Sequence, residues 1–184
     1  MRTVAMLGAP FFLVVAATTG AGAAADVGWP QTIELLTQER TQAETCVELL
    51  KSSGDKAAIL NGQISYDAAR AQTDGVIAGL TTTLVEGGKP DSLPTVQANL
   101  EKAGSDLQQI CDAAVKTASA TGGTKGVVED VAKAAIEPLV NAISSAVGAL
   151  WTRHVEKDAL ELETIKTQLE AAKWPDFGDI AAAQ

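Results

Sequence analysis

The sequence predicts an all-α protein, folded as an antiparallel up-and-down bundle of about four helices. Apolar residues recur at alternating spacings of three and four over several long stretches, which is the period of a helix face. Ala, Leu, Glu, Gln and Lys, all good helix formers, dominate these stretches. No stretch shows the sustained alternation of apolar and polar residues that a half-buried strand requires.

The first helix is predicted over residues 30–52. Pro30 suits the first turn of a helix, where its missing N–H is not needed. The segment "SSGD", residues 52–55, is expected to end the helix. Its expected buried face, in which Arg40 is the one charged member, consists of Ile33, Leu36, Arg40, Ala43, Val47 and Leu50.

The second helix is predicted to begin at Ser65 as its N-cap and to end near residues 86–90. Asp55 can cap a short preceding turn. Asn61-Gly62 resembles a hairpin turn, but the flanking runs are too short and too rich in Ala for strands, so we expect a bend there. One stripe, polar in its first half and apolar in its second, comprises Tyr66, Arg70, Thr73, Ile77, Leu80 and Leu84.

The third helix is predicted over residues 94–119, with Ser92 as N-cap and Pro94 in the first turn. The last helical pattern covers residues 127–173. As one straight helix it would reach about 70 Å, against about 39 Å for the third helix. Pro138 removes a backbone donor and clashes with the preceding turn. We therefore expect the last helix to be long, and kinked or broken near Pro138.

The first 25 residues have the layout of a secretory signal peptide. Arg2 precedes an apolar core over residues 4–17, and small residues with A-x-A spacing follow. An uncleaved membrane anchor is the alternative, although Gly8 and Pro10 make a poor spanning helix. We expect cleavage before Asp26, a single helical-bundle domain over residues 26–184, and a periplasmic or extracellular location.

The charge balance bears on the partners of the protein. With 14 basic and 23 acidic residues the net charge is −9, and it becomes −10 when Arg2 leaves with residues 1–25. Binding to phosphate groups requires clustered Lys and Arg, so nucleic acid is an unlikely partner on this composition. The partner is expected to be another protein or a second copy of the chain.

The two cysteines, Cys46 and Cys111, are predicted to form a disulfide. An exported protein with two cysteines usually pairs them. Cys46 lies 16 residues after Pro30 and Cys111 lies 17 after Pro94. If the first and third helices start at the same end of the bundle, the two sulfurs lie within about 2 Å of the same height. Two separate buried thiols are the alternative.

A polar group on the second helix is the candidate ligand site. It consists of Tyr66, Asp67, Arg70 and Asp74, whose spacing makes the last three neighbours on the helix surface. One interpretation is a polar pocket at one end of the bundle. The other is an exposed, salt-bridged start of a helix.

Metal, cofactor and catalytic chemistry find little support in the sequence. His154 is the single histidine; it shares a helix face with Asp158 and Glu161, but a solvated charged face is the simpler interpretation. No nucleophile elbow, P-loop or dinucleotide-binding glycine pattern is present. We expect no metal, no cofactor and no enzyme activity.

The sequence therefore predicts an exported helical bundle that acts by protein binding. One alternative is a membrane-active protein that uses residues 138–151, from Pro138 to Trp151, which are rich in small and apolar side chains. The lack of basic residues in that segment counts against insertion. A small-ligand carrier is the other alternative.

Two Trp-Pro pairs stand just outside the helical region, at Trp29-Pro30 and Trp174-Pro175. In a bundle with an even number of antiparallel passes, the start of the first helix and the end of the last lie at the same end. We expect Trp29 and Trp174, with Phe177, to meet there and cover the core. The alternative is two boundary signals that do not touch.

Overall fold

A computed structural model describes residues 28–87, 93–121, 128, 131, 136–152 and 159–182, so the predicted signal peptide lies outside the described residues. Every regular element within these ranges is helical, which confirms the predicted all-α class. The elements are α1 (Trp29–Ser52), α2 (Lys56–Leu80), the π-helical turn η1 (Thr81–Val85), α3 (Leu93–Thr121), α5 (Ile136–Trp151), α6 (Ala159–Ala171) and α7 (Phe177–Ala182).

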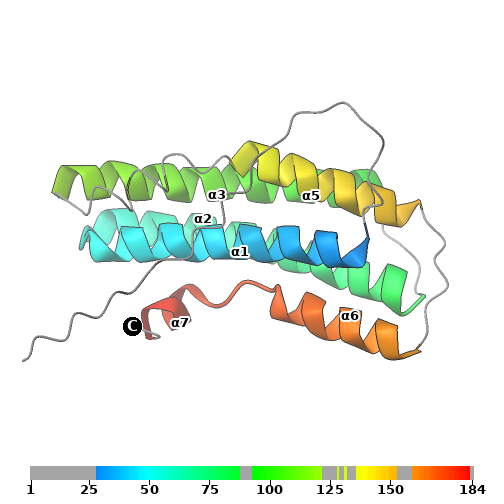
Figure 1. The fold of residues 1–184 in the computed structure, drawn as a ribbon. Helices are drawn as coiled ribbons and strands as arrows, with labels where there is room; N and C mark the ends of the chain where they lie inside the picture. Colours follow the sequence, from blue (N-terminus) through cyan, green and yellow to red (C-terminus); the bar gives the residue numbers. More distant parts are fainter. Residues whose placement is uncertain are drawn as a thin grey trace, which may run out of the picture.

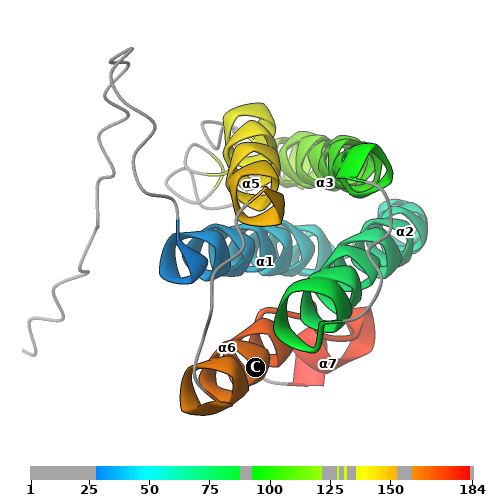
Figure 2. The ribbon, with the colours of Figure 1, turned by 90° about the vertical axis from the view of Figure 1, so that its right-hand side faces the viewer.

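The long helices run alternately in opposite directions, as in an up-and-down bundle (Figure 1). Seen end-on, α1, α2, α3 and α5 form a four-helix group, and α6 and α7 lie below α1 and α2 (Figure 2). α1 contacts each of the other long helices as well as α7. The buried side chains of all six α-helices join in one contiguous core.

The start of α2 differs from the prediction. α2 begins at Lys56, with the Asp55 carboxylate accepting hydrogen bonds from the backbone N–H groups of Ala57 and Ala58 at 3.0 and 3.1 Å. The helix continues through Asn61-Gly62 without a bend, so Ser65 lies inside the helix and is not an N-cap. Gly62 is buried, with Leu50 of α1 packed where a side chain would stand. The conformation at Gly62 therefore follows from close packing against α1, which outweighs the turn preference of Asn-Gly.

The predicted long last helix is divided, so α5 and α6 are separate elements. α5 packs on α1 and α3, whereas α6 packs on η1 and α1, from the other side of α1 (Figure 2). Thr152, directly after α5, is already in a turn. The kink or break predicted near Pro138 falls partly on residues 132–135, which lie outside the described residues. Pro138 itself is an exposed residue at the start of α5.

The extra pass changes which ends of the chain meet, and the predicted contact between the two Trp-Pro pairs is wrong. Trp29 starts α1, whereas Trp174 follows α6 and lies toward the opposite end of the bundle (Figure 1). Arg40 of α1 binds the carbonyl of Ala171, and Arg40 is already 11 residues, about 16 Å, beyond Trp29. Both tryptophans are buried, but separately.

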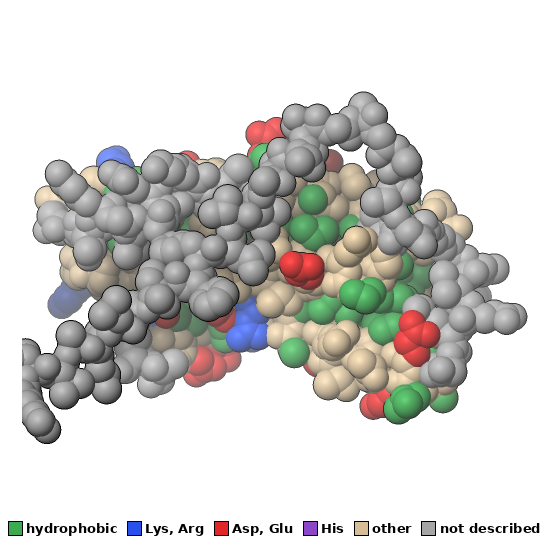
Figure 3. All heavy atoms as spheres, in the orientation of Figure 1, with side chains coloured by type: hydrophobic (Ala, Val, Ile, Leu, Met, Phe, Trp, Pro, Cys, Tyr) green, Lys and Arg blue, Asp and Glu red, His purple; other side chains and the backbone are tan. Residues whose placement is uncertain are grey.

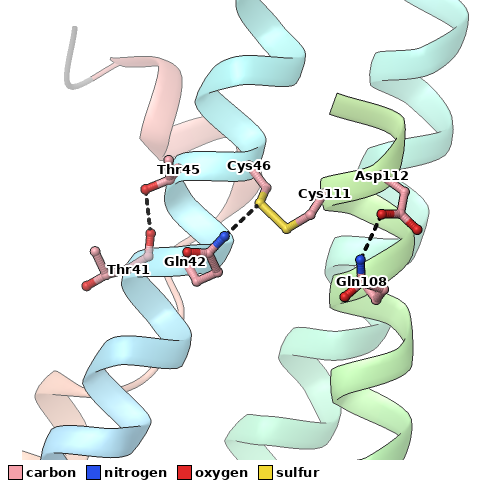
Figure 4. The surroundings of a disulfide bond; sticks show 7 residues. All are labelled: Thr41, Gln42, Thr45, Cys46, Gln108, Cys111 and Asp112. Carbon is pink, nitrogen blue, oxygen red and sulfur yellow. Dashed lines mark hydrogen bonds between the residues drawn. A yellow bond between two sulfur atoms is a disulfide. The ribbon is translucent and has the colours of Figure 1, made fainter. Parts of the chain in front are cut away.

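A disulfide joins Cys46 of α1 to Cys111 of α3 (Figure 4). The Cα atoms are 4.9 Å apart, and both residues are buried. Gln42, one turn before Cys46, points its amide at the Cys46 sulfur, with 3.6 Å between Nε2 and Sγ. α1 and α3 run in the same direction (Figure 1). The prediction that the two sulfurs lie at the same height depended on this condition.

α3 and α5 approach closely at Gly104. A Cβ atom at this position would lie 2.4 Å from Cγ2 and 3.2 Å from Cβ of Val140. The β-branched Val140 side chain has little rotational freedom with which to move away. Gly104 therefore sets the separation of these two helices.

We expect Gly104→Ala to lower the free energy of unfolding by about 1–3 kcal/mol, because the overlap with Val140 outweighs the better helix propensity of Ala. Gly79→Ala is the matched control, since a Cβ at Gly79 meets nothing within 4 Å. That change should stabilise by about 0.5–1 kcal/mol. Denaturant unfolding measures both, and equal effects of the two changes would contradict the close approach.

Removing the disulfide should lower the free energy of unfolding by roughly 4 kcal/mol in the chain-entropy model, for a sequence separation of 65 residues. We expect Cys46→Ala and Cys111→Ala to have similar effects, and the double variant to be no less stable than either single one. Thermal unfolding with and without reductant measures this. A loss in the double variant equal to the sum of the two single losses would show that the residues act independently.

Candidate functional site

The predicted polar group on α2 binds the chain's own segment after α6. Tyr66 is fully buried, and its hydroxyl donates a hydrogen bond to the carbonyl oxygen of Pro175 at 2.8 Å. The Tyr66 ring lies 5.3 Å from the ring of Trp174 and 5.5 Å from that of Phe177, the latter edge-on. Burial raises the pKa of Tyr66, so its hydroxyl stays a donor.

Arg70 and Asp74 hold the same segment from the next turn of α2. Arg70 forms ion pairs with Asp176 and, at 3.6 Å, with Asp74. Burial raises the pKa of Asp74, and the neighbouring backbone N–H of Trp174 and the Arg70 guanidinium oppose the rise.

Asp67, the fourth predicted member, lies apart from this group. It is exposed on α2, whereas Tyr66, Arg70 and Asp74 converge on residues 174–176. Two contacts from α1 extend the same arrangement, because Arg40 binds the carbonyl of Ala171 and Lys51 binds that of Phe177. The volume expected for a ligand is thus occupied by the chain itself.

Glu39 of α1 is a buried carboxyl group that the sequence pattern did not single out. Its exposed fraction is 0%, and neither carboxyl oxygen has a hydrogen-bond partner in the described structure. Burial raises its pKa from 4.5 to about 7. The predicted charged member of this face, Arg40, is instead half-buried at the edge, with its Nε 2.7 Å from Glu44.

Two open grooves of about 570 and 590 Å³ flank the start of α5. One lies against α1, and Thr37, Thr41 and Leu139 are among its lining residues; the other lies against α3, next to Gly104. In the right-hand half of Figure 3, the charged side chains visible on the face of α1, α5 and α6 are acidic. None of the four predicted pocket residues lines either groove.

The described part of the chain contains no group of three or more His, Cys, Asp or Glu side chains placed to hold a metal ion. His154 lies outside the described residues. Among the described helices, none has the length and apolar character needed to cross a bilayer.

The outward face of α2 is apolar except at Asp67. Its buried residues lie along one side of the helix and include Tyr66, Ala69 and Thr73. At 3.6 residues per turn, six exposed apolar or small residues lie along the opposite side, and the exposed carboxylate of Asp67 stands among them between Ile64 and Ala71. We call them the α2 outer stripe: Ala57, Leu60, Ile64, Ala71, Gly75 and Ala78.

The α2 outer stripe contains two of the three large hydrophobic side chains that are exposed in the described structure. Leu60 is 59% exposed and Ile64 is 63% exposed, and they lie one turn apart. α3 and the segment around α7 flank α2 (Figure 2), and the residues of the stripe are exposed. A surface helix usually carries its charged residues on this side.

Comparison of the chain with protein-family models, with curated protein sequences and with solved structures found no match. The geometry of the α2 outer stripe and of the buried groups is therefore the basis for assigning a function.

Removing the Tyr66 hydroxyl should weaken the attachment of residues 174–177. We expect Tyr66→Phe to cost about 1 kcal/mol of unfolding free energy, because the half-buried carbonyl of Pro175 loses its donor. Tyr66→Ala should cost about 3–5 kcal/mol, since the contacts with Trp174 and Phe177 are lost as well. Denaturant unfolding separates the two effects, and a Tyr66→Phe variant as stable as the parent would contradict a structural role for the hydrogen bond.

Glu39 should make stability depend on pH. Its pKa is raised in the folded state, so the folded protein holds the proton more tightly than the unfolded chain does. The protonated Glu39 therefore stabilises the folded state. This contribution is fully present below pH 4.5, and it is lost as the pH rises to about 7. We expect Glu39→Gln to be more stable than the parent by up to roughly 3 kcal/mol above that pH, and by much less under acidic conditions.

The matched control for Glu39 is Glu48→Gln, which changes an exposed glutamate of the same helix. Unfolding measured over a pH series should show a pH-dependent difference from the parent for Glu39→Gln alone. A constant difference at all pH values would mean that Glu39 is not the titrating group.

Proposed function

We propose that this chain is an exported helical-bundle protein that acts by binding a protein partner through the α2 outer stripe. The exposed pair Leu60 and Ile64, on a face whose one charged member is Asp67, is the observation that carries the proposal. Monomeric proteins rarely leave such a contiguous apolar face open to water. Helix-on-helix docking would use anchors at this spacing.

The construction of α2 supports an interaction role. A helix that faces solvent on one side needs only one apolar side, and a helix that is apolar on two sides packs against neighbours on both. Leu60 and Ile64 are absent from the core, and the bundle keeps its contiguous core without them. Their apolar character is therefore explained by a partner and not by the fold of the single chain.

Export is supported by the cysteine pair and by the pattern of the first 25 residues. Disulfides persist in oxidising compartments such as the periplasm and the cell exterior, and thiols stay reduced in the cytosol. Both cysteines of the chain take part in the bond. A location outside the cytoplasm is part of the proposal.

The two alternative functions receive less support. The apolar side of α5, proposed for membrane activity, is buried against α1 and α3, with Ile143 and Val147 fully covered. The polar group proposed for a carried ligand is occupied by residues 174–176. We propose binding rather than catalysis because the observation that carries the proposal, the exposed pair Leu60 and Ile64, offers apolar contact and no reactive group.

Site-specific photocrosslinking in the native cell tests the proposal. A photoreactive amino acid in place of Leu60 or Ile64 should give an adduct with a second polypeptide. The same residue in place of Leu160, which is 80% exposed on α6, is the matched control and should give none. Absence of any polypeptide adduct at Leu60 and Ile64, or equal adducts at Leu160, would overturn the proposed function.

A further inference from the structure

We infer that the partner of the α2 outer stripe is a second copy of this chain, docked with its α2 antiparallel. This inference rests on the proposed function and names the partner of the same surface. The stripe extends from Ala57 to Ala78, about 32 Å along the helix axis. Its six members follow the spacing of three and four that packs two helices side by side, with one gap of seven between Ile64 and Ala71, where Asp67 and Ala68 stand.

The order of large and small residues along the stripe makes it complementary to itself. Its N-terminal half carries the two large side chains, Leu60 and Ile64, and its C-terminal half carries only Ala71, Gly75 and Ala78. Placing two copies antiparallel, with the two-fold axis between Asp67 and Ala68, sets each large residue opposite a small one. Leu60 then faces Gly75 of the second copy, and Ile64 faces Ala71.

Space for these contacts is present at the small residues. A Cβ atom added at Gly75 would meet nothing within 4 Å, so the surface there is open to an incoming side chain. Ala57 of one copy faces Ala78 of the other in the same register, so all six members are used. A two-fold interface of this kind places the same patch on both copies and closes the assembly at a dimer.

Other arrangements of two stripes pack less evenly. A parallel pair sets Leu60 against Leu60 and Gly75 against Gly75, which crowds one end and leaves a gap at the other. An antiparallel pair can be shifted by one heptad in either direction. One shift sets Ile64 against Ile64, and the other leaves Leu60 beyond the end of the second stripe. Interhelical distances are about 8–10 Å and depend on the side chains at the contact, so large residues set opposite small ones keep the separation even along the stripe.

Charge acts against this dimer and gives it a recognisable dependence on salt. With residues 1–25 removed each chain carries a net charge of −10, and Asp67 lies beside the two-fold axis, opposite Ala68 of the second copy and one residue away from the second Asp67. Added salt screens this repulsion and leaves the apolar contact intact. Association should therefore strengthen with ionic strength, and it should strengthen with Asp67→Asn.

A swap of large and small residues tests the register. Sedimentation equilibrium of the disulfide-bonded chain should show a reversible dimer. Leu60→Ala and Gly75→Leu should each weaken association by at least about tenfold, through a lost contact and through overpacking respectively. The double variant Leu60→Ala/Gly75→Leu should recover most of the loss, because it again sets a large residue opposite a small one.

Folding of the monomer is not expected to explain these changes. Leu60 is 59% exposed, and the site of Gly75 is open, so both substitutions leave the core unchanged. Leu160→Ala is the matched control, since it removes an exposed leucine of α6 outside the stripe. It should leave association unchanged.

The outcomes separate this inference from the proposed function. Additive losses in the double variant, or a parent chain that stays monomeric, would overturn the antiparallel dimer. If Leu60 then still gives a photoadduct with a different polypeptide, the proposed function stands and the partner is another protein. If the photoreactive residue at position 60 gives no adduct with any polypeptide, both the dimer and the proposed function are contradicted. A photoadduct of twice the chain mass, with recovery by the double variant, supports both.

Discussion

The fold depends on the burial of α1 on several sides at once. α2, α3, α5, α6 and α7 all contact it, and the exposed part of α1 is a polar face that includes Glu34, Thr37 and Thr41. The disulfide fixes α1 to α3. Arg40 and Lys51 fix it to the segment that leads from α6 into α7. The same burial accounts for the chemistry of Glu39: a residue at that point of α1 faces the core whatever its side chain, and its pKa rises because water is excluded.

Much of the fold could be predicted from helical periodicity, and the errors came from local signals that tertiary packing overrode. The spacing of Cys46 and Cys111 from their helix starts depended only on the rise per residue, and the structure places the two sulfurs at bonding distance. Asn61-Gly62 was taken for a bend because its turn preference is strong, yet Leu50 needs the space that Gly62 leaves. The division between α5 and α6 had no comparable signal in the sequence, and missing it changed the number of passes and separated Trp29 from Trp174.

The candidate sites show the same limit. The spacing of the polar residues on α2 could be recognised in the sequence. Spacing does not show which residues from a distant part of the chain pack against them, and here Tyr66 and Arg70 bind Pro175 and Asp176. Glu39 was missed because the spacing of three and four can be continued through either Glu39 or Arg40, and Arg40 was chosen. The two side chains point about 100° apart around the helix, so only one of them can face the core. The α2 outer stripe could have been found from the sequence by continuing the heptad spacing on the second side of α2. The exposure of Leu60 and Ile64 is what distinguishes it from core.

The attachment of Trp174 and Phe177 to Tyr66 also constrains the order in which the protein can fold. A chain emerges from the ribosome or from a translocation channel with its N-terminal side first, so α1 and α2 are present long before residue 174. Until then Tyr66 lacks its hydrogen-bond acceptor, which lies 109 residues further on, and the side of α2 next to it stays open. Closing so long a separation is slow compared with forming a helical hairpin. A chain that stops short of Trp174 therefore retains an exposed aromatic surface, of the kind that chaperones and proteases recognise.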